Sequence, residues 1–221
     1  MMRDMIFTLL GAFRTPLRSA GLAALVLAAP AMATAAQAAS PAETFVSDNI
    51  QKGLQILANR GPQRASQFEA FLENLTDISR IGRFTLGNAR RTASPADIAA
   101  FDAAFKNYAI AVYQSRLGAY TGQTLKVTGS TQNGTGDYTV STVMVDPSAD
   151  KSQQPLTVGF RVVSEGARMV VIDVSVAGVW LSIEERDQFS AFLSQHNGSI
   201  PALVTHLEQL TTQLRNGNAG R

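Results

Sequence analysis

The chain contains no cysteine among its 221 residues, so it forms no disulfide bond and offers no thiol nucleophile or thiolate metal site. It has only two histidines and one tryptophan, and charged residues make up 16% of it. No apolar run after residue 33 approaches the roughly 20 residues of a membrane-spanning helix. Cysteine chemistry is excluded, and a membrane span in the body of the chain is not expected.

Motifs of common catalytic sites are also missing. The chain has no Gly-x-Ser-x-Gly elbow and no Gly-x-x-x-x-Gly-Lys-Ser/Thr phosphate loop. His196 and His206 are ten positions apart and lack carboxylate or cysteine companions at metal-ligand spacing. We therefore expect no metal site and no cofactor, and we expect both histidines to lie on the surface or cap helices.

The N-terminus has the pattern of an export signal. Three arginines precede an apolar run over residues 20–33, and Ala36-Gln37-Ala38 has the small-x-small form of a signal peptidase site. The run is too short and too rich in alanine for a good membrane span. We predict cleavage after Ala38 and a single exported domain over residues 39–221. A retained N-terminal anchor is the alternative.

The positive charge of the chain belongs to this signal. Removing Arg3, Arg14, Arg18 and Asp4 from the 19 basic and 17 acidic residues leaves 16 of each sign. A neutral domain lacks the basic surface that nucleic acid binding requires, so nucleic acid is not expected as a partner.

The first half of the domain shows helical spacing of apolar residues. We expect helices from Ser40-Pro41 to Gly61, around residues 68–75, from about Asp77 to Gly87, and from Ser94 to near Gly122. Serine before proline at the first and last of these starts is typical of an N-cap.

Beyond Gln123 the apolar period changes from helical to two. Strands are predicted near residues 125–127 and over 138–145, 156–163 and 169–176, with a turn cluster over 130–136. The connections are short, which favours an antiparallel meander over a parallel sheet.

Two helices are expected to follow the strands. The first opens with a capping box at Ser182-Ile-Glu-Glu185 and closes at Asn197-Gly198, and the second covers Ser199 to about Leu214. Residues 216–221 are predicted to be a loose tail. The fold class is therefore α+β, a curved antiparallel sheet of about four to five strands covered on one face by amphipathic helices.

Several segments, taken in order, resemble the MlaC family, also called the toluene-tolerance auxiliary family. They are Leu86 to Arg91 with Ser94, Phe101 and Phe105, the Tyr108 to Tyr120 helix, Ile172-Asp173-Val174 through Gly178, and Arg186 to Phe189. The resemblance covers about residues 41 to 214. It implies a periplasmic phospholipid-binding component of an ABC-type lipid transport system, which shuttles lipid between an inner-membrane ABC transport complex and an outer-membrane lipoprotein complex. We expect this carrier to be a monomer without cofactor. A hopanoid-associated branch shares the pattern, so hopanoid or another apolar lipid is an alternative cargo.

Such a carrier needs an apolar cavity between the sheet and the helices. Its candidate lining residues are Phe68, Phe71, Leu75, Phe101, Phe105, Tyr108, Val112, Val158, Phe160, Val162, Ile172 and Val174. Periodicity shows which faces are apolar but does not tell a closed core from a cavity, so an ordinary core is the alternative for each residue.

Arginines supply the candidate polar contacts. Arg80, Arg83, Arg90 and Arg91 lie around the end of the third predicted helix. Guanidinium groups pair with phosphate oxygens, so these four are candidates for a lipid headgroup or a partner surface, or they form a solvated face. Arg186 is expected to pair with a carboxylate such as Asp173.

Two other classes of protein are weighed against the carrier. In a small cone-shaped α+β isomerase or dehydratase, Asp173 would act as the base, with Tyr108 or Tyr113 as proton donor. A purely structural envelope protein would bind no ligand.

Overall fold

The computed structural model describes residues 38–115, 120–149 and 154–219. Residues 39–221 form one compact unit. The predicted export signal and cleavage site fall on residues 1–38, which lie almost entirely outside the described ranges, and stay a prediction. No helix in the described part of the chain is both long and apolar enough to cross a bilayer.

The domain is α+β, as predicted. Its helices are α2 (Pro41–Ala58), α3 (Arg64–Leu75), α4 (Ile78–Thr85), α5 (Pro95–Gln114), α6 (Leu181–Gln195) and α7 (Ile200–Ala219), with a 3-10 turn η1 (Gly87–Arg91) between α4 and α5. Its strands are β1 (Thr124–Gly134), β2 (Asp137–Val145), β3 (Thr157–Glu165), β4 (Arg168–Val176) and β5 (Val179–Trp180).

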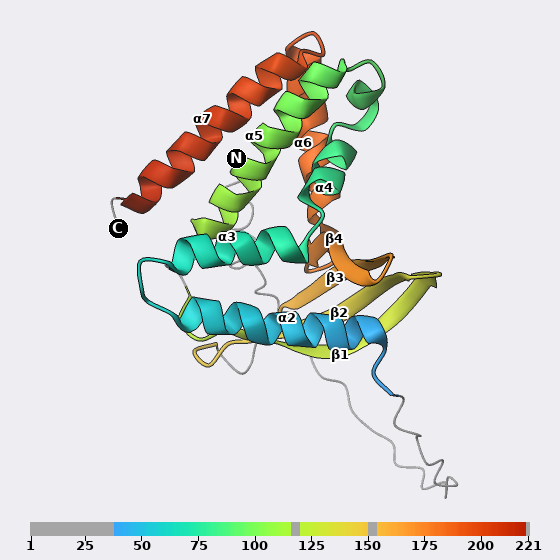
Figure 1. Ribbon diagram of the computed structural model, residues 1–221, viewed down its shortest axis with the longest axis vertical. Coiled ribbons are helices and arrows are strands. Elements are labelled where there is room, and N and C mark those ends of the chain that lie inside the picture. The colour runs from blue at the N-terminus through green and yellow to red at the C-terminus, as the bar shows by residue number, and fades with distance from the viewer. Residues whose placement is uncertain (1–37, 116–119, 150–153, 220–221) are drawn as a thin grey trace, which may run out of the picture. The chain divides into compact units, whose positions relative to one another are not determined.

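The five strands form one antiparallel meander in the order β1-β2-β3-β4-β5 (Figure 1). The connection between β1 and β2 is shorter than predicted. Strand β1 runs to Gly134, so most of the predicted turn cluster is strand and only Thr135 and Gly136 turn the chain. Residues 130–134 form strand rather than turn because their alternating side chains can pair with β2 even though the sequence is rich in turn residues.

Three helix starts follow their sequence signals. The side chains of Ser40, Asp77 and Ser94 accept hydrogen bonds from the backbone N–H three residues on, at 3.2, 2.9 and 3.1 Å. Each bond satisfies one of the donors that a helix leaves free at its N-terminus.

Three helix boundaries differ from the prediction. Helix α6 begins at Leu181 rather than at a Ser182 capping box, because the Ser182 hydroxyl donates to Asp173 instead. Helix α7 continues to Ala219, past Leu214 and into the predicted tail. Helix α5 ends at Gln114 with Ser115 as its C-cap, short of the predicted end near Gly122, because residues 120–122 are not helical; residues 116–119 lie outside the described ranges.

A β-bulge in β4 breaks the expected alternation of that strand. Arg161 pairs with Asp173, but Val162 pairs with Val171, so Ile172 is the extra residue. As a result Val171 and Val174 both pack into the layer beneath α2.

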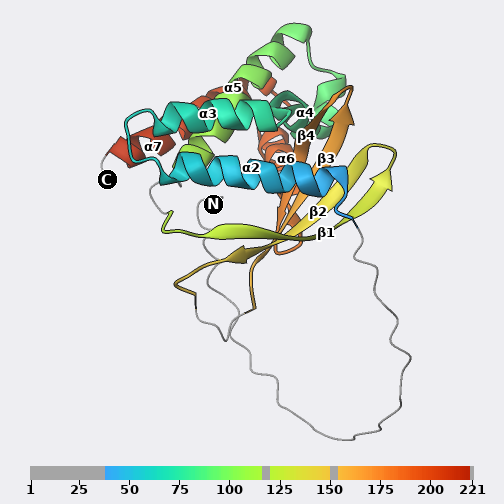
Figure 2. The ribbon, with the colours of Figure 1, turned by 60° about the horizontal axis from the view of Figure 1, so that its bottom comes forward.

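Helix α2 lies across one face of the sheet over β1 and β2, and α3 packs beside α2 (Figure 2). Helices α4, α5, α6 and α7 pack against one another, and α4 and α6 contact β4 (Figure 1). On the opposite face of the sheet Lys126, Ser141 and Arg161 are exposed. The helices therefore cover one face, as predicted. On the opposite face Val163, Val170 and Ser175 of β3 and β4 are also buried, so only part of that face is open to solvent.

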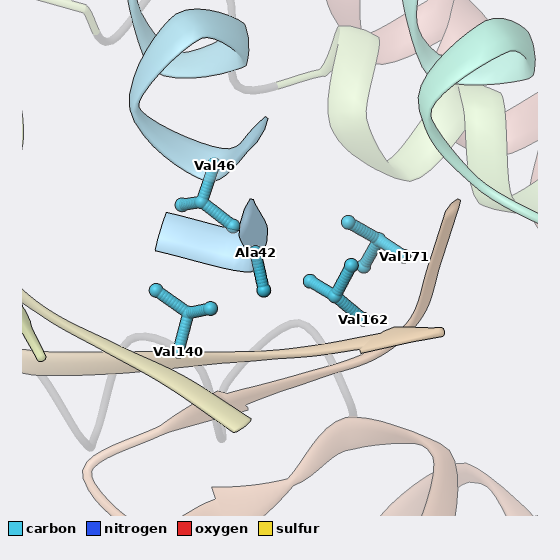
Figure 3. Close-up of a cluster of buried hydrophobic side chains, with 5 residues drawn as sticks. All are labelled: Ala42, Val46, Val140, Val162 and Val171. Atoms are coloured by element: carbon cyan, nitrogen blue, oxygen red, sulfur yellow. The ribbon is translucent and has the colours of Figure 1, made fainter. Parts of the chain in front are cut away.

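The contact between α2 and the sheet has a small aliphatic centre. Ala42 and Val46 of α2 point down onto Val140, Val162 and Val171, and all five are at most 3% exposed (Figure 3). Two helix positions four apart, which lie on one face of α2, thus meet one residue from each of three neighbouring strands.

Candidate functional site

The apolar layer between α2 and the sheet is only partly closed. Eight further apolar side chains pack against the aliphatic centre yet stay partly exposed: Phe45, Ile50, Leu75, Val127, Tyr138, Phe160, Met169 and Val174. Leaving apolar area in water costs about 25 cal/mol per Å². The layer thus keeps apolar surface that a ligand can cover at a gain in free energy.

Partly exposed apolar side chains also occur along the C-terminal half of α2 and on the neighbouring helices α3 and α5. Leu54 and Leu57 of α2, Phe68 of α3 and Val112 of α5 are all half-buried. Helices α2 and α3 approach closely, since a Cβ at Gly53 would lie 3.4 Å from the ring of Phe71. These helices place apolar side chains beside the sheet without sealing them from water.

Two hollows open at the edges of α2. One has a volume of about 420 Å³ and lies between α2 and α3, lined by Phe45, Asp48, Asn49, Lys52, Phe71 and Asn74. The other has a volume of about 680 Å³ and lies where α2 turns into α3, opposite the start of β1, lined by Leu57, Ala58, Arg60, Arg64, Tyr120, Thr121 and Gly122. Both combine apolar and polar side chains.

The structure divides the predicted lining residues between two places. Leu75, Val162, Phe160 and Val174 lie in or against the layer beneath α2, and Phe71 reaches the first hollow. The other members near the sheet and α3, namely Phe68, Val112, Val158 and Ile172, are half-buried apart from Val158, which is 8% exposed.

Phe101, Phe105 and Tyr108 belong to the core of the helices. Phe101 and Phe105 stack with ring centroids 5.7 Å apart, and both meet the ring of Phe189 edge-on at 6.1 and 6.2 Å. Their exposed fractions are 0% and 6%, and that of Tyr108 is 4%. These aromatic rings contact one another across α5 and α6 and present almost no surface to a ligand.

A half-buried acid joins this aromatic core. The hydroxyl of Tyr108 on α5 hydrogen-bonds the carboxyl group of Glu185 on α6. Burial raises the pKa of Glu185 to about 7, the Tyr108 hydrogen bond opposes the rise, and the charge of Glu184 adds to it. The sequence did not indicate this role of Glu185, because the residue lies in a pattern typical of the polar start of a helix.

Asp173, the base of the enzyme alternative, is occupied as a hydrogen-bond acceptor. Its carboxylate accepts from the backbone N–H groups of Val174 at 2.8 Å and Ser182 at 3.2 Å, and from the Ser182 hydroxyl. The residue therefore anchors the start of α6 to β4. The expected pairing with Arg186 is wrong, because the Arg186 guanidinium lies over the ring of Phe84, 5.4 Å from its centroid.

The four candidate arginines fall into two pairs. Arg80 lies 3.6 Å from a Glu165 carboxylate oxygen, and Arg83 makes a bidentate pair with Asp102, with Nε–O distances of 2.9 and 3.2 Å. Both carboxylates come from distant parts of the sequence, so no local pattern indicated them. Arg90 and Arg91 are exposed on η1 and form no ion pair within the described ranges.

The two histidines stack on opposite sides of one aromatic ring. The Phe192 ring centroid is 3.9 Å from that of His196 and 4.6 Å from that of His206. In the described ranges no three His, Asp or Glu side chains gather closely enough to hold a metal ion.

Sequence reasoning also missed Phe45, Ile50, Arg60 and Arg64. The apolar stripe of α2 indicated the first two as helix residues, but only packing shows that both stay partly exposed and that Phe45 lines a hollow. Arg60 and Arg64 flank the Gly61-Pro62 turn, and their convergence on one hollow depends on where β1 begins.

The helices and the sheet hold partly exposed apolar side chains between them. This is the arrangement of a protein that binds an apolar ligand. The family model described as "MlaC protein" matches residues 43–209. The chain belongs to the MlaC family.

A solved structure supports the same fold. It is the phospholipid-binding protein from Ralstonia solanacearum, determined in complex with a phospholipid. The two proteins are 21% identical, the match covers 79% of this chain and 96% of the other, and the TM-score is 0.63.

Proposed function

We propose that this protein is a periplasmic lipid carrier that holds the acyl chains of a phospholipid between α2, α3 and the sheet. The observation that carries the proposal is the ring of partly exposed apolar side chains around the aliphatic centre, from Phe45 to Val174. Two acyl chains of about 30 methylenes, at roughly 0.8 kcal/mol each, gain on the order of 24 kcal/mol on leaving water. Acyl chains that cover these apolar side chains leave water, and so gain part of this transfer free energy.

The predicted lining residues have three different roles in this proposal. Acyl chains contact the partly exposed residues of α3, the end of α5 and the sheet, namely Phe68, Phe71, Leu75, Val112, Phe160, Ile172 and Val174. Val158 and Val162 form the floor. Phe101, Phe105 and Tyr108 support the wall from inside the helical core.

Phospholipid is the proposed cargo because the structural neighbour from Ralstonia solanacearum was determined with one bound. Hopanoid or another apolar lipid would use the same apolar surface. The proposed carrier acts as a monomer, is exported with its signal removed by cleavage after Ala38, and exchanges lipid with an inner-membrane ABC complex and an outer-membrane lipoprotein complex.

Arg90 and Arg91 are the proposed contact with those partners. They are exposed, unlike Arg80 and Arg83 they have no carboxylate partner in the described part of the chain, and a nearby apolar ring, Phe84, is 43% exposed. Arg186 links the two features, since it covers Phe84 and lies next to Gly87 at the start of η1. Positive charge beside exposed apolar surface suits an acidic partner surface.

The decisive experiment is mass spectrometry of organic extracts from mature protein purified from its own periplasm without detergent. We expect one lipid per protein, with phospholipid as the main species. Stoichiometric hopanoid would keep the mechanism and change the cargo. Protein that is empty, and stays empty after mixing with lipid vesicles, would overturn the carrier function.

A further inference from the structure

The direction of α2 over the sheet locates one end of the apolar layer. Near its start, the Ser40 and Ser130 hydroxyl oxygens lie 2.8 Å apart, and the Ser130 hydroxyl donates to Glu43 at 2.6 Å. The opposite end of α2, at Leu57 and Ala58, borders the 680 Å³ hollow together with residues 120–122, which precede β1. Helix α2 therefore runs antiparallel to β1, from the aliphatic centre to this hollow.

Two arginines line this hollow, Arg60 in the loop after α2 and Arg64 at the first position of α3. The Asn59 side-chain oxygen accepts from the Gly61 N–H at 2.8 Å, its amide donates to Gln67 at 3.1 Å, and the Arg64 N–H donates to the Gly61 carbonyl at 3.1 Å. These hydrogen bonds fix the backbone of the turn that joins Arg60 to Arg64. A fixed backbone lowers the entropy that a ligand must overcome when it binds both side chains.

Among the described residues, no carboxylate pairs with Arg60 or Arg64. By contrast, Arg80, Arg83 and Arg161 each have a carboxylate partner. Asp146 is hydrogen-bonded to Gln123, which follows the hollow residue Gly122 in the chain. The Asp146 carboxylate already accepts hydrogen bonds from Ser148 and Gln123. Two guanidinium groups next to the apolar side chains of Leu57 and Ala58 offer an anion site at the end of an apolar surface.

We infer that Arg60 and Arg64 bind the phosphate of the lipid headgroup, and that the acyl chains run from this hollow beneath α2 toward the aliphatic centre. Guanidinium groups pair bidentately with phosphate oxygens. The hollow's volume of about 680 Å³ lies within the range of small-molecule sites. The inference rests on the proposed carrier function and assigns one end of the same site.

The test is a competition between two lipids with identical acyl chains. Vesicles contain equal amounts of phosphatidylglycerol and diacylglycerol, and the ratio of the two lipids taken up by lipid-free protein is measured by mass spectrometry. The wild type should favour the phosphate-bearing lipid, and R60Q/R64Q should lose that preference by about tenfold or more, because charge-assisted bonds to phosphate are strong. The control K126Q/R215Q removes the same charge at two exposed positions elsewhere and should keep it.

Each other outcome has a defined meaning. A preference that is unchanged in R60Q/R64Q, with the thermal midpoint also unchanged, would overturn the assignment of the headgroup. Inorganic phosphate that binds lipid-free wild type tightly, and is not displaced by phosphatidylglycerol, would assign the arginines to a free anion and overturn it as well. Wild type that takes up neither lipid would instead contradict the carrier function itself.

Discussion

Glu185 is the acidic residue whose surroundings most change its chemistry. Burial against α5 raises the pKa of its carboxyl group from 4.5 to about 7. The folded protein therefore binds this proton more tightly than the unfolded chain does. Stability from this group is complete below about pH 4.5 and is lost as the pH rises through about 7.

Replacing Glu185 with Gln should remove this pH dependence, because the amide keeps an acceptor for Tyr108 and carries no charge. A shift of this size corresponds to about 3 kcal/mol, at 1.36 kcal/mol per pKa unit. We expect the free energy of unfolding of E185Q, relative to wild type, to rise by about 2 to 3 kcal/mol between pH 4.5 and pH 8 in urea titrations. The exposed control E208Q should follow the wild type, and parallel curves for E185Q and wild type would contradict the prediction.

Ala177 adopts a backbone conformation that suits it poorly. Its φ is 51° and that of Gly178 is 83°, in the two-residue turn that pairs Val176 with Val179. The left-handed region costs a residue with a Cβ roughly 1–2 kcal/mol, and Asn tolerates it better than Ala.

A177N should therefore raise the free energy of unfolding by about 0.5 to 1 kcal/mol, seen as a higher thermal midpoint. Ala167, in the turn after Gly166, has no such positive φ, so A167N is the matched control and should change little. Equal effects of the two substitutions would show that the turn conformation is not their cause.

At the scale of elements, α4 and α5 meet where glycine leaves no spare room. A Cβ at Gly82 would lie 2.7 Å from the Phe105 ring, which is itself 6% exposed and packed against Phe189. The ring has nowhere to move, so overpacking outweighs the gain in helix propensity of about 1 kcal/mol.

G82A should lower the free energy of unfolding by about 1 to 3 kcal/mol in denaturant titration. Gly217 is also helical, in α7, and no atom lies within 4 Å of a Cβ built there. G217A should therefore be neutral or stabilising. A stabilised G82A would mean that α4 and α5 can separate at little cost.

At the scale of the molecule, bound lipid should stabilise the fold, because it covers the partly exposed apolar side chains between α2 and the sheet. A ligand at about 100 times its Kd adds roughly 2.7 kcal/mol. For a domain of this size that corresponds to a rise of about 5 to 10 °C in Tm. Calorimetry of native and delipidated protein should show this difference, and reloading should restore it. Identical Tm values would indicate that the apolar layer closes without ligand.

Much of the architecture follows from local patterns. The caps at Ser40 and Ser94, the period-two strands and their short connections lead to the meander and to the helical layer on one face. Where tertiary contacts compete with a local signal, the signal fails. Ser182 bonds Asp173 rather than capping its own helix, and the bulge at Ile172 changes which β4 residues face α2.

The sequence by itself determined which residues are apolar on which face, the order of helices and strands, and the family pattern. Only the tertiary structure decided that Phe101 and Phe105 close a core while Phe160 and Val174 remain reachable, and that Arg80 and Arg83 are paired while Arg60 and Arg64 are not. The reason is physical: periodicity reports the face of one element, whereas burial and ion pairing depend on what a different element, distant in the sequence, brings to that face.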